Sequence, residues 1–383
     1  MKKILIIFLS FLLSGCSLLS NIQYSIDSKK QEQYIENIID HNTKLDYQNH
    51  YFLKQLSDID LAFVIKVYEG MMNFDETIEI NLPFSSQNRP LELLELLQDE
   101  CPELYQFTTN GSNNNVVCNW ILNRKELVSI EMSYLMSKEE YNDSLDIINT
   151  EIQNIEEIVK DYSDFDKEMY AYNYIVDHCQ YNEKTNHYSS PYGVFIESQA
   201  ACLGIARTMQ WIMNECGIEC MTIGGYTEHK QSGHAWNIIK LDNEYYSVDP
   251  TSDTNRLDDD KYKMYLYFNV TDNEIRNNYT LQSCLKNVPD TTGTKYNYFT
   301  YTNHFVSENE DAQTKINALL TQSYFNNQKE CSIKIENKDV YDTIVNNVSS
   351  IYNNWLLSCS LSFIPCSFAN SDEYQVIYFQ FQY

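Results

Sequence analysis

Residues 233–249 read GHAWNIIKLDNEYYSVD, in which two apolar-rich runs flank the turn pair at residues 242–243. Such a pattern is typical of a β-hairpin with a two-residue turn. In that register Trp236 faces Asp249, and His234 lies one diagonal step away on the same face of the hairpin. A shift of one residue in the turn would place His234 directly opposite Asp249. In either register the imidazole and the carboxylate can meet.

A second motif lies upstream, where residues 198–207 read SQAACLGIAR. They lead into a run whose apolar residues recur at helical spacing, and Gly217 follows that run as an expected helix stop. Cys202 therefore falls at the start of a helix, where unpaired N–H groups and the positive end of the helix dipole favour a thiolate. The same N–H groups can hold the oxyanion of a tetrahedral intermediate. Gly204, just inside the helix, keeps its start uncrowded.

The two motifs together supply the three groups of a thiol triad. We interpret Cys202 as the nucleophile, His234 as its base and Asp249 as the carboxylate that orients the imidazole. His229 is an alternative base, although it falls in a polar loop, and Cys220 is an alternative nucleophile that lacks a helix start. A further alternative is a domain that keeps these residues but serves only for binding.

Three sequence blocks resemble the signature blocks of the transglutaminase-like superfamily. They are ACLGIA at residues 201–206, GHAWN at residues 233–237 and YSVDPT at residues 246–251. Two positions depart from the usual pattern, because Ile205 stands where relatives carry Tyr and Ser252 stands where they carry Trp. Neither departure removes a catalytic group.

The resemblance covers roughly residues 161–270 and implies a fold and an activity. The expected fold is α+β, with a papain-like core in which the Cys202 helix packs on an antiparallel sheet that carries His234 and Asp249. The implied chemistry is acyl transfer through a thioester, with neither a metal nor an organic cofactor. Hydrolysis of a peptide or amide bond is the leading version. The alternatives are a cross-linking transglutaminase and a non-catalytic surface protein for binding or adhesion.

The N-terminal residues predict export and a lipid anchor. Two lysines precede the apolar run at residues 4–13, which is too short to span a bilayer and fits the core of a signal peptide. The residues LSGC at positions 13–16 resemble a bacterial lipobox, which makes Cys16 the expected lipidation site. The alternative is an ordinary secretory leader with an incidental cysteine. We expect an extracytoplasmic protein, anchored by lipid to the bacterial cell membrane.

Net charge limits the kinds of partner that the protein can bind, and cysteine spacing bears on metal binding. The 383 residues carry a formal net charge of −27 at pH 7, so a nucleic acid is not an expected partner. The expected partner is a peptide or protein substrate at the cell surface, with cell-wall peptide among the candidates. There are 11 cysteines, and most of them are expected to be small buried residues. Cys216 and Cys220 lack two further ligands at suitable spacing, so no metal site is predicted.

The segments around the motifs read as two small α+β units. Ser137 and Glu140 form a capping-box pattern before a long helical stretch. Alternating residues predict strands over residues 77–82, 296–301 and 331–335. The predicted organisation is a signal peptide (1–15), a lipidated cysteine with a polar tether (16–50), an N-terminal α+β unit (51–160), the catalytic domain (161–280) and a C-terminal α+β unit (281–383).

Overall fold

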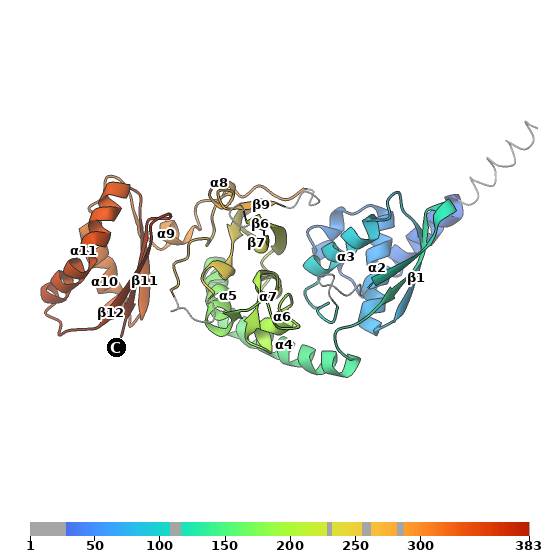
Figure 1. The fold of residues 1–383 in the computed structure, drawn as a ribbon, viewed down its shortest axis with the longest axis horizontal. Helices are drawn as coiled ribbons and strands as arrows, with labels where there is room; N and C mark the ends of the chain where they lie inside the picture. Colours follow the sequence, from blue (N-terminus) through green and yellow to red (C-terminus); the bar gives the residue numbers. More distant parts are fainter. Residues whose placement is uncertain (1–27, 108–115, 228–231, 255–261, 282–286, 383) are drawn as a thin grey trace, which may run out of the picture. The chain divides into compact units, whose positions relative to one another are not determined.

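The computed structural model describes residues 28–107, 116–227, 232–254, 262–281 and 287–382 (Figure 1). The chain divides into two compact units, Met1–Met136 and Ser137–Tyr383. Both contain helices and strands, and the predicted α+β class is confirmed. Across the described ranges, no helix is both long enough and apolar enough to cross a membrane.

The first unit is a three-stranded antiparallel sheet with helices packed on it. The strand order is β1-β3-β2. The core includes Phe63 and Val64 of helix α2 (Asp58–Asn73) and Ile130 of the central strand β3 (Glu126–Met132). Ser57 caps that helix by accepting a hydrogen bond from the Asp60 amide. The elements of this unit are a helix over residues 28–40, η1 (Tyr47–Asn49), η2 (Leu53–Gln55), α2 (Asp58–Asn73), β1 (Thr77–Pro83), α3 (Arg89–Glu100), β2 (Val116–Ile121), η3 (Leu122–Arg124) and β3 (Glu126–Met132).

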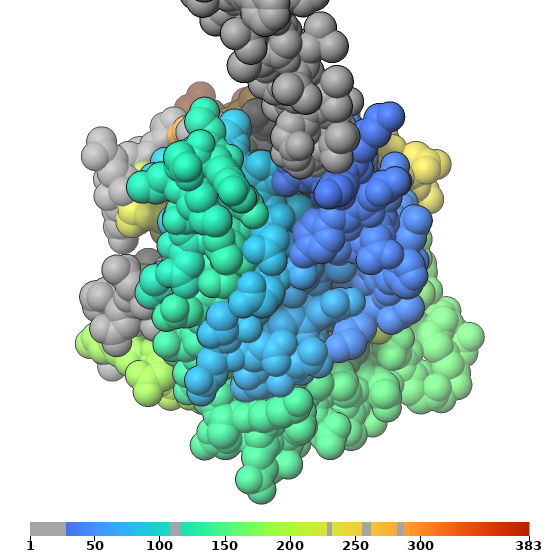
Figure 2. Space-filling view, turned by 90° about the vertical axis from the view of Figure 1, so that its right-hand side faces the viewer, coloured from blue at the N-terminus to red at the C-terminus, as the bar shows by residue number. Residues whose placement is uncertain are grey.

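Residues 28–50 differ from the predicted tether. Ile35 and Leu45 are buried in the core of the first unit, and the Tyr34 hydroxyl donates to the Ile80 carbonyl oxygen at 3.1 Å. The segment is polar on average, but Tyr34, Ile35 and Ile38 share one face of the helix over residues 28–40, and that stripe is enough to dock the helix. Figure 2 shows these residues in dark blue against the lighter blue of the segment that follows. Cys16 and the preceding residues lie outside the described ranges.

The second unit begins with α4 (Lys138–Val159), whose capping box is formed as predicted. The Ser137 hydroxyl accepts from the Glu140 amide, and the Glu140 carboxylate accepts from the Ser137 amide. The boundary between the units falls at residues 136 and 137, so this helix belongs to the second unit and not to the predicted segment 51–160.

The centre of the second unit carries the predicted hairpin and cysteine helix. Its main sheet has the order β8-β7-β6-β9, with α7 packed against β6 and β7. The first predicted register is confirmed, with Leu241 paired to Glu244 and Asn237 to Val248. Both turn residues have positive φ, 48° at Asp242 and 68° at Asn243, as a two-residue hairpin turn requires. The elements are α5 (Asp164–His178), β4 (Gln180–Tyr181), α6 (Pro191–Phe195), β5 (Gln199–Ala200), α7 (Cys202–Glu215), β6 (Cys220–Thr227), β7 (Gly233–Leu241), β8 (Glu244–Val248), η4 (Pro250–Ser252), α8 (Asp272–Ile275) and β9 (Tyr279–Leu281).

The C-terminal part of this unit is a four-stranded sheet with two long helices. The strand order is β10-β11-β13-β12. The prediction of a strand over residues 296–301 is wrong, because Tyr298–Tyr301 form the short helix α9. Alternating aromatic residues suit a strand or a single helical turn, and here Tyr298 and Phe299 are both buried among neighbouring rings such as Tyr265. The remaining elements are β10 (Phe305–Val306), α10 (Ala312–Phe325), β11 (Glu330–Ile335), α11 (Lys338–Ser358), β12 (Cys366–Ser371) and β13 (Val376–Phe381).

Candidate active site

Cys202 is the first residue of α7, as the sequence predicts. Every residue of this helix from 204 to 213 is buried, which fixes the position of the helix in the domain. Ala201 at the N-cap makes no side-chain capping bond, and the first amide bonded within the helix is that of Ile205, which donates to the Ala201 carbonyl oxygen at 3.0 Å. The first N–H groups of a helix have no intrahelical acceptor, so this end of α7 offers donors beside the thiol.

A loop crosses closely over the start of α7. The Ala201 amide donates to the Tyr188 carbonyl oxygen at 2.8 Å, and the buried Arg207 donates to the Ser189 carbonyl oxygen at 3.1 Å. A Cβ atom at Gly204 would lie 2.6 Å from the Tyr188 oxygen. The missing side chain at Gly204 therefore allows the loop to pack against the cysteine-bearing end of the helix.

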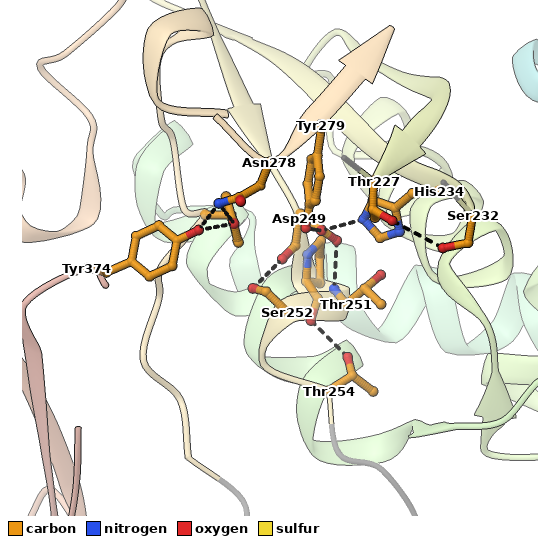
Figure 3. Close-up of polar contacts among 12 residues, drawn as sticks. Thr227, Ser232, His234, Asp249, Thr251, Ser252, Thr254, Asn278, Tyr279 and Tyr374 are labelled. Atoms are coloured by element: carbon orange, nitrogen blue, oxygen red, sulfur yellow. Dashed lines mark hydrogen bonds and ion pairs between the residues drawn. The ribbon is translucent and has the colours of Figure 1, made fainter. Parts of the chain in front are cut away.

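His234 and Asp249 are joined by a short hydrogen bond. His234 Nε2 lies 2.8 Å from Asp249 Oδ2, and the Asp249 side chain is only 1% exposed (Figure 3). The Cys202 side chain lies close enough to His234 for the thiol to raise the pKa of the imidazole. Since Nε2 faces the carboxylate, Nδ1 is the ring nitrogen left for the thiol. The structure thus brings the three predicted residues together, from α7, β7 and the end of β8.

The Asp249 carboxylate accepts two further hydrogen bonds. The Thr251 amide donates to Oδ1 at 2.9 Å, and the Tyr279 hydroxyl donates to Oδ2 at 2.7 Å. Burial raises the pKa of Asp249, but the facing His234 and these donors outweigh burial and hold the pKa below its ordinary value. The carboxylate is therefore charged at neutral pH.

The pKa of His234 is shifted in the opposite direction, above its ordinary value. Burial is the largest single effect and lowers the pKa of His234, but the charge and hydrogen bond of Asp249 and the neighbouring Cys202 side chain together outweigh it, and the pKa reaches about 10. An imidazole with this environment holds a proton at neutral pH. The site is thus suited to keep a proton on His234 beside the sulfur of Cys202.

Tyr279 is a site residue that sequence reasoning missed. It belongs to β9, which pairs with β6 at the edge of the main sheet. It lies 30 residues beyond Asp249 in the chain, and its segment contains no motif whose spacing relates it to the hairpin. Only the pairing of β9 with β6 brings its hydroxyl to the carboxylate.

Cys220 and His229 are the alternative nucleophile and the alternative base. Cys220 is buried in β6, and burial raises its pKa well above the ordinary value for a thiol. Cys101, Cys179 and Cys331 are likewise buried. The prediction that most cysteines are buried is wrong for the described residues, because the other described cysteines are partly exposed: Cys118, Cys202, Cys216, Cys359 and Cys366. His229 lies outside the described residues. Among the residues that the structure describes, no group of three or more His, Cys, Asp or Glu side chains is arranged to hold a metal ion.

Comparison with known proteins identifies the class of this domain. Residues 153–250 match the model of the transglutaminase-like superfamily, and the match contains Cys202, His234 and Asp249. The predicted transglutaminase-like domain is confirmed over this stretch. A search of curated proteins found no significant match.

Similar solved structures include a TGase, which is 17% identical, with 40% of this chain and 48% of that chain covered and a TM-score of 0.29. A candidate cysteine protease from Cytophaga hutchinsonii is 13% identical, with coverages of 33% and 52% and a TM-score of 0.24. A candidate protease from Parabacteroides distasonis is 10% identical, with coverages of 38% and 35% and a TM-score of 0.22. This chain spans about half, or less, of each of these proteins.

Proposed function

We propose that this protein is an extracytoplasmic thiol enzyme that hydrolyses a peptide or amide bond through a thioester on Cys202. One observation carries the proposal. The carboxylate of the buried Asp249 is hydrogen-bonded to His234 at 2.8 Å, and the thiol at the start of α7 lies beside the imidazole. This is the arrangement that an activated sulfur nucleophile needs: a partner for its proton, and a carboxylate that fixes that partner.

In the proposed reaction the sulfur of Cys202 attacks the carbonyl carbon of the scissile amide. N–H groups at the start of α7 stabilise the oxyanion that forms. His234, which holds the proton taken from the thiol, gives it to the leaving amine as the C–N bond breaks. Water then attacks the thioester, His234 accepts a proton from it, and breakage of the C–S bond releases the acid and the thiolate.

A cross-linking reaction differs only in its second half, because a lysine amine replaces water as the acyl acceptor. The match to the transglutaminase-like superfamily keeps this version open as a second candidate. Mass spectrometry of the products separates the two, since hydrolysis yields a free acid and cross-linking yields an isopeptide bond. A surface protein that only binds would show neither product and no selective reactivity of Cys202.

We predict that Cys202 is the first thiol to react with iodoacetamide at mildly acidic pH. An imidazolium and helix N–H groups favour its thiolate, whereas burial raises the pKa of Cys118 and raises that of Cys216 to about 11. Peptide mapping after short exposure to the reagent measures the order of reaction. If Cys118 or Cys359 reacts first while Cys202 stays unmodified, the catalytic proposal is wrong.

We also propose that Cys16 carries the lipid that anchors the protein to the cell membrane. The lipobox-like residues 13–16 support this, and a diacylglycerol supplies the two acyl chains that stable anchoring requires. The negative charge of the chain would by itself repel an anionic lipid surface, so attachment depends on the lipid. The substrate would then be a peptide or protein at the cell surface, such as cell-wall peptide.

The prediction for Cys16 is that a metabolic fatty-acid label marks the wild type and not Cys16→Ala. The labelled band should partition with the membrane fraction, and the unlabelled variant should leave it. Cys359→Ala is the matched control and should label like the wild type. Equal labelling of wild type and Cys16→Ala would refute the lipid anchor and leave the reaction at Cys202 unaffected.

A further inference from the structure

The Tyr279 hydroxyl makes the shortest hydrogen bond to the triad carboxylate. It donates to Asp249 Oδ2 at 2.7 Å, against 2.8 Å for His234 Nε2 on the same oxygen. The Tyr279 ring is 8% exposed and lies against two residues of β7, with centroid distances of 4.5 Å to His234 and 5.3 Å to Trp236. Tyr279 therefore touches both the carboxylate and the imidazole.

Tyr267, which precedes α8, packs on this tyrosine and is itself held by the turn of the C-terminal hairpin. Tyr267 stacks on Tyr279 with ring centroids 5.1 Å apart and an interplanar angle of 22°. The Tyr267 hydroxyl is hydrogen-bonded to that of Tyr374, in the turn between β12 and β13, and accepts from Asn278 Nδ2 at 3.0 Å. Figure 3 shows Tyr374 reaching Asn278 from the C-terminal strands. A line of contacts thus runs from the last hairpin to Asp249.

We propose that Tyr279 is a positioning residue of the thiol site, braced by the C-terminal hairpin through Tyr267 and Tyr374. The inference rests on the proposed function, because it assigns Tyr279 a task in the reaction at Cys202. A buried carboxylate keeps its charge only while donors satisfy its oxygens. The Tyr279 hydroxyl supplies one of three such donors and stops the carboxylate from turning away from His234.

Several titratable groups face Asp249, and they offer a matched control. Asp253 is a second buried carboxylate, and its Oδ2 accepts from the Tyr172 hydroxyl at 3.0 Å. Tyr172→Phe therefore removes a buried tyrosine–carboxylate bond as Tyr279→Phe does, but from a carboxylate outside the triad. The groups that face Asp249 are His234 on β7, Tyr279 on β9, Tyr172 on α5, Tyr267 before α8 and Asp253 after η4, with Cys202 on α7 beyond His234.

The experiment measures the rate of Cys202 alkylation by iodoacetamide against pH in the full chain. Without the Tyr279 hydroxyl, Asp249 accepts a proton more readily and His234 loses its charged partner at a higher pH. The acid-side midpoint of the profile in Tyr279→Phe should therefore rise by about one pH unit, the effect of one hydrogen bond to a charged group. Tyr374→Phe should move it in the same direction by less. Tyr172→Phe should move it far less than Tyr279→Phe, because the Tyr172 hydroxyl donates to Asp253 and not to Asp249.

A second measurement separates positioning from a merely structural role. If Tyr279 acts through Asp249, adding Tyr279→Phe to Asp249→Asn should change the profile no further. Superimposable profiles of the wild type and Tyr279→Phe would overturn the positioning role while leaving the proposed function intact. A wild-type Cys202 that does not react would overturn both. Should Tyr279→Phe fail to melt cooperatively, Tyr267→Phe carries the test, since it keeps the stacked ring and removes the brace.

Discussion

His234→Ala is expected to lower Cys202-dependent turnover about 10³-fold or more. In the proposed reaction the imidazole holds the thiol proton, donates it to the leaving group and takes a proton from water, so its loss affects both halves of that reaction. Hydrolysis of p-nitrophenyl acetate measures this without knowledge of the natural substrate. The nitrophenolate needs no proton to leave, so the residual rate of acylation should exceed that of deacylation.

His178→Ala is the matched control, because that imidazole is exposed at the end of α5, where it stacks on Tyr174. It should hydrolyse the ester at the wild-type rate. Cys202→Ala sets the background that both variants are compared with. If His234→Ala keeps wild-type turnover while Cys202→Ala abolishes it, His234 is not the base of the reaction.

Asp249→Asn is expected to lower turnover roughly 10²- to 10⁴-fold while leaving substrate affinity nearly unchanged. The charge on Asp249 is what raises the pKa of His234 against the effect of burial. Without that charge burial prevails, the pKa of His234 falls below its ordinary value, and the imidazolium no longer supports a thiolate. NMR titration of His234 and the pH profile of Cys202 alkylation measure the change. Superimposable alkylation profiles would mean that Asp249 is not the third member of the triad.

The same substitution should destabilise the fold in a defined pH window. The raised pKa of His234 contributes stability that is present below its ordinary value and lost as the pH rises through about 10. The lowered pKa of Asp249 contributes stability that is lost as the pH falls through its folded value. The difference in unfolding free energy between wild type and Asp249→Asn should therefore be largest near neutral pH. An asparagine also cannot accept all the bonds from His234, Thr251 and Tyr279, since its NH₂ group faces donors.

The candidate active site could be predicted from the sequence because its determinants are local. The turn pair at residues 242–243 sets the hairpin register, which brings the strand of His234 beside Asp249. The apolar spacing after Cys202 sets the helix and puts the thiol at its start. Each pattern lies within about twenty residues, where backbone geometry relates spacing to position.

Contacts between distant segments could not be predicted from the spacing of residues in the sequence. Residues 28–50 are polar on average, yet Ile35 and Leu45 dock into the first core, because a narrow apolar stripe suffices once a receiving surface exists. Residues 296–301 alternate like a strand, but packing of Tyr298 against Tyr265 favours a helical turn. In both cases tertiary packing outweighed the local pattern.

The sequence by itself determined which side chains form the candidate site and on which elements they lie. Only the tertiary structure decided what supports them. Tyr279 reaches Asp249 because β9 pairs with the far edge of β6, and Tyr267 reaches the C-terminal hairpin because its hydroxyl meets that of Tyr374. The physical reason is that a hydrogen bond between distant segments depends on how sheets and helices pack, and no local backbone preference specifies that packing.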